Sequence, residues 1–219
     1  MRRPQLIGTR LWTKYEGRLL ELFFAAIELL QNRDLKTVTD EDDISRTLSQ
    51  CLETANLRLR QVGRGFDMIP VFNAPTQPRV SDPVRVSAVF KRPDFQHQLI
   101  DDVAQLSVYY NVECKRLGDS HFSNDYVDDG VKRFLDPSHS YGRDCCSGAM
   151  IGYLQNAEPE RVLAQVNTRA SSHKIPVIKL SMDGWCLNGV SRLDNIFERM
   201  FPVTRFHLRH LWIDLRHHY

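Results

Sequence analysis

The sequence contains no hydrophobic run long enough to cross a bilayer. Its richest apolar stretch, residues 19–30, is interrupted by Glu21 and Glu28, whereas a membrane-spanning helix needs about 20 mostly apolar residues. Arg2 and Arg3 at the N-terminus are not followed by an apolar segment and a small-residue cleavage site, so no secretory signal is expected. These absences predict a cytoplasmic protein that does not contact a membrane.

The sequence also lacks a cysteine framework and a strong charge of one sign. Its five cysteines are odd in number and include no CxxC pair, which predicts reduced thiols rather than disulfides or a zinc site. The 29 Lys and Arg residues nearly balance the 27 Asp and Glu residues, giving a net charge of +2. Total charge alone therefore does not indicate a nucleic-acid-binding protein.

Length and composition predict one globular domain. The chain has 219 residues, 42% hydrophobic and 26% charged, which is typical of soluble domains with a sizeable core. Apolar residues at helical spacing predict one helix over residues 11–32 and a second that begins at Thr39 as N-cap. We interpret residues 1–38 as a helical extension packed on the core, and residues 39–219 as a single unit.

The remaining sequence alternates between strand and helix patterns. Residues 63–83 contain four prolines and two glycines and predict an irregular loop with a short strand within residues 66–72. Together these patterns predict an α/β protein with a central mixed sheet flanked by helices. The expected segments are a hairpin of residues 84–97 and 106–115, helices at 126–135 and 158–169, and strands at 149–154, 175–181 and 205–215.

Asp94, Glu113 and Lys115 form the most informative pattern. Because side chains alternate along a strand, Glu113 and Lys115 share one face, and the expected hairpin brings Asp94 beside them. Two carboxylates and the backbone carbonyl of Cys114 would suit Mg²⁺, which prefers oxygen ligands. The competing interpretation is a solvated strand face with an incidental salt bridge.

These residues resemble the signature of the PD-(D/E)xK, or restriction-endonuclease-like, nuclease superfamily. An Asp on one strand, Asp94, precedes Glu113-Cys114-Lys115 on the next, and the sequences of residues 126–134 and 148–153 are similar to those of small nucleases in bacterial restriction and phage-defence systems. The resemblance spans residues 39–153. It implies an αβββαβ core with an added N-terminal helix.

The resemblance also implies the chemistry of the site. Asp94, Glu113 and Lys115 would be catalytic, with Mg²⁺, or Mn²⁺ in its place, held by Asp94, Glu113 and the Cys114 carbonyl. A Glu on the first core helix serves the site in some members, and Glu41 or Glu53 matches it. For Glu41 the competing interpretation is a simple complement to the helix dipole.

Basic residues downstream of the motif are candidates for contacts with nucleic-acid phosphates, although they also fit an ordinary charged surface. They are Arg116, Lys132, Arg133 and Arg143. The expected function is metal-dependent endonucleolytic cleavage of DNA in restriction or anti-phage defence, by a possible homodimer or a subunit of a larger complex. The alternatives are a catalytically inactive nuclease-like module that binds nucleic acid or protein, and a nuclease for RNA or branched DNA.

Overall fold

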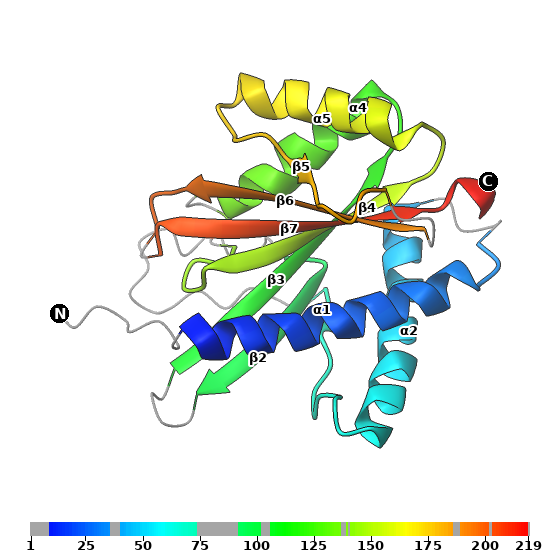
Figure 1. Cartoon of the computed structure of the whole chain (residues 1–219), viewed down its shortest axis with the longest axis vertical. Coiled ribbons are helices and arrows are strands. Elements are labelled where there is room, and N and C mark those ends of the chain that lie inside the picture. The colour runs from blue at the N-terminus through cyan, green and yellow to red at the C-terminus, as the bar shows by residue number, and fades with distance from the viewer. Residues whose placement is uncertain are drawn as a thin grey trace.

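The described residues of the protein are built around a seven-stranded mixed sheet. The computed structural model describes residues 9–35, 40–73, 92–101, 106–136, 139, 141–185, 189–201 and 203–218 (Figure 1). The strand order is β1-β2-β3-β4-β7-β6-β5. β3, β4 and β7 run parallel to one another, and the other neighbours are antiparallel. The strands are β1 (Val71–Phe72), β2 (Phe95–Asp101), β3 (Leu106–Leu117), β4 (Ser147–Leu154), β5 (Lys179–Leu180), β6 (Val190–Glu198) and β7 (Arg205–Asp214).

Helices cover both faces of this sheet. In Figure 1, α1 and α2 lie on one side, and α4 and α5 lie on the other. Between α4 and β4 the chain makes one π-helical turn and then one 3₁₀ turn. The helical segments are α1 (Thr9–Gln31), α2 (Glu41–Gln61), α4 (Ser120–Asp125), the π-helix η1 (Tyr126–Gly130), the 3₁₀ helix η2 (Val131–Phe134), α5 (Pro159–Ser172) and the 3₁₀ helix η3 (Arg216–His218).

A single hydrophobic cluster joins the two layers of helices to the sheet. The apolar stripe of α1, from Trp12 to Leu30, is buried in the same cluster as the inward side chains of α2, β3, β4 and β7. Trp12 also donates a hydrogen bond to the Ser147 hydroxyl at 2.7 Å. The N-terminal helix is therefore an integral part of the core. No helix within the described ranges is long and apolar enough to cross a membrane.

The expected hairpin is confirmed for the described residues. β2 pairs with β3 antiparallel, with Phe95 opposite Val112 and Asp101 opposite Leu106. Residues 84–91, the first half of the expected first strand, and residues 102–105, between the two strands, lie outside the described part of the chain. The α/β class and the mixed sheet flanked by helices are also confirmed.

The N-terminus of the second helix lies one residue later than expected. Its N-cap is Asp40, whose side chain accepts a hydrogen bond from the Asp43 N–H at 2.8 Å. Thr39, the expected N-cap, lies outside the described residues. Gly63 follows the end of the helix with a φ of 71°, a backbone conformation that glycine adopts without strain. The helix itself ends at Gln61, with Val62 as its C-cap.

Two expected segments require correction, and one strand was not expected. The helix expected at 126–135 begins at Ser120, because the Asp119 side chain accepts the N–H groups of His121 and Phe122. The strand expected at 175–181 is reduced to β5, because the Asn167 side chain bonds both the N–H and the carbonyl of Ile178. Strand β6 was not expected, since its buried positions include the polar residues Ser191 and Asn195, which obscure the alternating pattern.

Candidate active site

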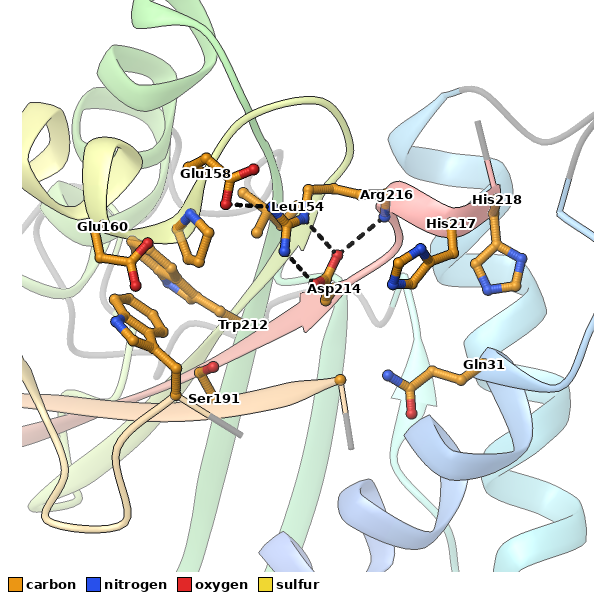
Figure 2. A pocket seen from close by; sticks show the side chains of 13 residues that line it. Gln31, Leu154, Glu158, Glu160, Ser191, Trp212, Asp214, Arg216, His217 and His218 are labelled. Carbon is orange, nitrogen blue, oxygen red and sulfur yellow. Dashed lines mark hydrogen bonds and ion pairs between the residues drawn. The ribbon is translucent and has the colours of Figure 1, made fainter. Parts of the chain in front are cut away.

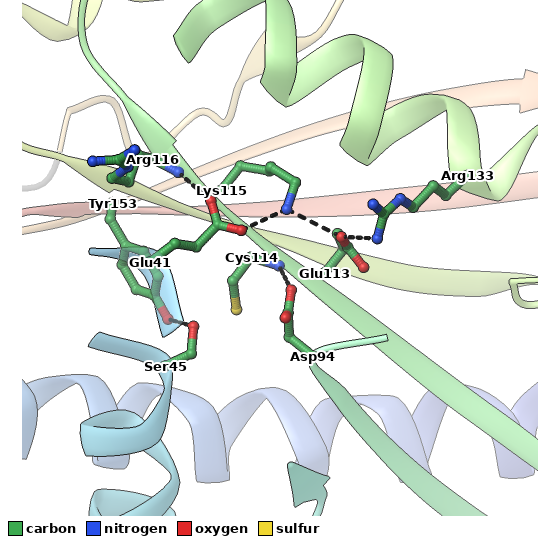
Figure 3. A network of polar contacts seen from close by, with 9 residues as sticks. All are labelled: Glu41, Ser45, Asp94, Glu113, Cys114, Lys115, Arg116, Arg133 and Tyr153. Atoms are coloured by element: carbon green, nitrogen blue, oxygen red, sulfur yellow. Dashed lines mark hydrogen bonds and ion pairs between the residues drawn. The ribbon is translucent and has the colours of Figure 1, made fainter. Parts of the chain in front are cut away.

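The candidate site lies where β3 continues past Phe95, the first residue of its antiparallel neighbour β2. The ladder between the two strands ends at the Phe95–Val112 pair. Past this point, the Cys114 N–H donates to Asp94 Oδ2 at 2.6 Å, and the Arg116 N–H donates to Glu41 Oε2 at 3.1 Å (Figure 3). Because the N–H and carbonyl of one strand residue point to the same edge, the Cys114 carbonyl is also directed toward this edge.

Glu113 and Lys115 project together from one face of β3, as strand alternation predicts. Lys115 Nζ lies 2.6 Å from Glu41 Oε1 and 3.2 Å from Glu113 Oε1. Arg133, on η2, bonds the same Glu113 Oε1 (Figure 3). We call Glu41, Asp94, Glu113, Lys115 and Arg133 the Glu113 cluster. The Cys114 side chain is buried on the opposite face, near the hydrogen-bonded hydroxyls of Ser45 and Tyr153.

Two carboxyl groups of this cluster, Asp94 and Glu113, are buried in surroundings that disfavour their charged forms. Burial raises the pKa of Asp94 to about 6, although Lys115 and the Cys114 N–H act in the opposite direction. Burial and the nearby Asp94 charge raise the pKa of Glu113 to about 8, despite the cations of Lys115 and Arg133. Glu113 Oε2 is buried and has no hydrogen-bond partner in the described part of the chain. An additional positive charge near these two carboxylates would therefore be favourable.

Lys115 is held in its protonated form. Burial alone would lower the pKa of this ammonium, but the carboxylates of Glu113, Glu41 and Asp94 together raise it above its usual range. Gly130 of η1 lies against the Lys115 side chain. If Gly130 carried a Cβ atom, that atom would lie 3.4 Å from Lys115 Cγ and would overlap the Met150 methyl group. The π-helical turn thus brings the backbone close to Lys115. Such turns are common at functional sites.

Arg199, which the sequence analysis did not single out, holds the loop that follows η2. Arg199 is only 6% exposed, and its guanidinium donates to the carbonyls of Phe134, Tyr141 and Cys145 at 3.1, 3.2 and 2.8 Å. These contacts fix both ends of the loop between Arg133 and β4. Arg199 therefore supports the position of Arg133 without touching the carboxylates itself.

The structure brings most of the expected site residues together. Asp94, Glu113, Lys115, Arg116 and Arg133 all appear in the network of Figure 3, together with Glu41 from the N-terminus of α2. The other candidate glutamate on this helix, Glu53, is exposed.

Two of the expected phosphate contacts lie outside this network. Lys132 is turned toward Asp128 at 3.8 Å, and its side chain is 41% exposed. Arg143 is half-buried in the turn of residues 141–144 that precedes β4. The role of these two residues as phosphate contacts therefore stays a prediction.

The Glu113 cluster fits a hard divalent cation better than a softer metal. Among the residues that the structure describes, no three His, Cys, Asp or Glu side chains come together as a ready metal site. Mg²⁺ does not need such a set, because it keeps several waters and is usually held by one or two carboxylates. Asp94, Glu113 and the Cys114 carbonyl provide that donor set, and the unpartnered Glu113 Oε2 provides a free ligand atom.

A separate cavity of about 620 Å³ opens at the carboxyl ends of β4 and β7 (Figure 2). We call it the Arg216 pocket. Arg216 bonds Asp214 at 2.8 and 3.0 Å and Glu158 at 2.7 Å. The rings of Trp185 and Trp212 stack on its wall with centroids 6.1 Å apart. Its arginine is thus already paired with carboxylates of the same pocket.

We compared the chain with protein-family models, curated proteins and solved structures, and none matched.

Proposed function

We propose that the protein is a divalent-metal-dependent nuclease of the PD-(D/E)xK type, and that the Glu113 cluster hydrolyses phosphodiester bonds. The observation that carries the proposal is the pair of buried carboxylates, Asp94 and Glu113, whose pKa values are raised to about 6 and about 8 beside a protonated lysine. Burying such a pair destabilises the fold. A bound cation would offset this cost.

The order of the elements supports the same proposal. Among the described residues from α2 to β4, the elements follow the order α2, β1, β2, β3, α4, β4, which matches the αβββαβ order implied by the resemblance. Asp94 immediately precedes β2, and Glu113 and Lys115 lie on β3. A solvated strand face is a poor alternative, because Glu113 is only 1% exposed.

Each side chain has a separate role in this proposal. Asp94, Glu113 and the Cys114 carbonyl would hold Mg²⁺ or Mn²⁺. The cation, when bound, supplies an activated water and polarises the phosphoryl oxygen. Lys115 remains an ammonium, so it donates hydrogen bonds and offsets charge on the phosphate rather than accepting a proton. Glu41 orients Lys115 through the 2.6 Å contact.

We infer DNA as the substrate, and restriction or anti-phage defence as the setting, from the resemblance alone. Metal-assisted hydrolysis acts on the phosphodiester group, which DNA and RNA share. A homodimer would suit double-strand cleavage, because each chain carries one such cluster.

A panel of substrates tests the proposal. Supercoiled plasmid, linear duplex, branched DNA and single-stranded RNA are incubated with the wild type and with Asp94→Ala in Mg²⁺ and in Mn²⁺. We expect cleavage of DNA by the wild type and its loss in Asp94→Ala, with thermal unfolding showing that the variant is folded. Full activity in Asp94→Ala contradicts the proposal. Nucleic-acid binding without cleavage under every condition favours the inactive module instead.

A further inference from the structure

Unsatisfied buried polar atoms concentrate at the Glu113 cluster. Seven buried side-chain atoms have no hydrogen-bond partner in the described part of the chain, and three of them are Glu113 Oε2, Arg133 Nε and the Tyr141 hydroxyl. Buried polar atoms in folded proteins are almost always paired, so such a concentration calls for an explanation. Here an acceptor and a donor of opposite charge are both left unsatisfied within one site.

The bonds of Arg133 are distributed unevenly. Its Nη1 bonds Glu113 Oε1, the same oxygen that Lys115 contacts at 3.2 Å. One carboxylate oxygen therefore receives two cations, while Oε2 receives none. The guanidinium side chain is 25% exposed and Glu113 only 1%, so Arg133 is the outer of the two groups. In this position it supplies positive charge to Glu113 in the absence of a metal.

Arg133 has the chemistry to serve a second partner. A guanidinium binds phosphate through two parallel N–H groups, with a geometry that an ammonium lacks. The unused Nε–H is one of these donors. The Tyr141 hydroxyl already lies beside this guanidinium: burial lowers the pKa of Arg133, but the Glu113 charge and the contact with Tyr141 raise it.

We propose that Arg133 exchanges partners during the reaction, leaving Glu113 for a backbone phosphate of the substrate when a divalent cation binds Glu113. This inference rests on the proposed nuclease function. A cation at Glu113 repels the guanidinium and replaces its charge, and the phosphate offers Arg133 new acceptors. The exchange satisfies Glu113 Oε2 with the cation and Arg133 Nε with the phosphate. Arg133 thus competes with the metal before substrate binds and holds the substrate afterwards.

Direct metal titration separates this proposal from a purely structural role. Calorimetric binding of Mn²⁺ is measured without nucleic acid for the wild type, Arg133→Ala, Arg133→Lys and Lys132→Ala. We expect Arg133→Ala to bind Mn²⁺ several-fold more tightly, because the competing cation is gone. Arg133→Lys should remain close to the wild type, because it keeps the charge. Lys132→Ala is the matched control for Mn²⁺ affinity, since its side chain is turned toward Asp128.

Cleavage kinetics provide the second half of the test. Although Arg133→Ala binds metal more tightly, it should cleave more slowly and with a raised KM, and Arg133→Lys should recover only part of the loss. A folded Arg133→Ala variant whose Mn²⁺ affinity is unchanged or weaker overturns the exchange, and cleavage by the wild type would leave the nuclease function standing. If neither the wild type nor Arg133→Ala binds Mn²⁺ or cleaves any substrate, the nuclease function itself is overturned.

Discussion

The Glu113 cluster and the Arg216 pocket combine the same kinds of residues with opposite electrostatic results. Each brings an arginine to carboxylates near the end of a parallel strand (Figures 2 and 3). In the pocket, burial acts against ionisation of Asp214, but hydrogen bonds from Arg216 hold its pKa below the ordinary value. In the cluster, the pKa values of Asp94 and Glu113 are raised despite two nearby cations.

The charges of the Arg216 pocket therefore stabilise one another. The Glu113 cluster, despite its two cations, would still be stabilised by one more positive charge. The Arg216 pocket is a cavity of about 620 Å³, and a cavity of this size is a default candidate for a ligand site. However, its arginine is fully engaged by Asp214 and Glu158. The Glu113 cluster leaves buried polar atoms unpaired. Strained charges of this kind are typical of catalytic sites, where function rather than stability determines the residues.

The largest difference between the two regions should appear in cleavage rates. Lys115→Ala removes the ammonium that offsets charge on the phosphate, and we expect a loss of about 100- to 1000-fold in rate. Arg216→Ala disrupts the other region and should leave the rate unchanged. The measurement is steady-state cleavage of one labelled duplex by both variants and the wild type. A comparable loss in both variants would remove the distinction between the regions.

The pH dependence of stability should have opposite signs in the two regions. Because the folded-state pKa values of Glu113 and Asp94 are raised, their stabilising contribution is complete below the ordinary carboxyl pKa and is lost as pH rises through about 6 and about 8. In metal-free buffer, Glu113→Gln should therefore unfold at a higher temperature than the wild type near pH 9. This advantage should shrink toward pH 5.

Asp214→Asn provides the matched control for this pH prediction. The folded-state pKa of Asp214 is lowered, so its contribution is present above the ordinary carboxyl pKa and is lost as pH falls through the lowered value. Asp214→Asn should be less stable than the wild type at neutral pH, and the two should converge in acid. If Glu113→Gln is also destabilising at high pH, the carboxylates of the cluster are not strained.

The smallest expected effect concerns the surface around the cluster. In the cleavage-inactive Glu113→Ala background, Lys132→Ala should weaken binding to duplex DNA equally for all sequences. It should also reduce the slope of log affinity against log salt by about 1, the effect of one lost phosphate contact. Arg143→Ala should behave similarly, and Arg216→Ala should not. Fluorescence anisotropy over a range of salt concentrations checks the slope, and an unchanged slope in Lys132→Ala excludes it from the DNA-binding surface.

Local patterns were sufficient to predict how the central residues meet. Strand alternation placed Glu113 and Lys115 on one face, and the hairpin brought Asp94 to the adjacent edge. These relations depend only on the period of a strand and on one antiparallel pairing. The same reasoning predicted the apolar faces of α1 and α2.

The surroundings of these residues depend on contacts that local patterns do not encode. Arg199 donates to backbone carbonyls of an irregular loop, and carbonyls carry no sequence signal. The contact of Arg133 with Glu113 depends on the π-helical turn at 126–130, where a regular α-helix was expected. A buried arginine and a widened helical turn therefore shape the site as much as its motif does.

The most direct test of the central claim is a Mg²⁺ titration of plasmid cleavage. Supercoiled plasmid is incubated with the wild type, Glu113→Ala and Asp214→Asn over a range of Mg²⁺ concentrations, each protein having first been shown to be folded. We expect saturable Mg²⁺-dependent cleavage by the wild type and by Asp214→Asn, and none by Glu113→Ala at any concentration. Cleavage by Glu113→Ala at the wild-type rate, or cleavage by the wild type that does not depend on Mg²⁺, would contradict the account.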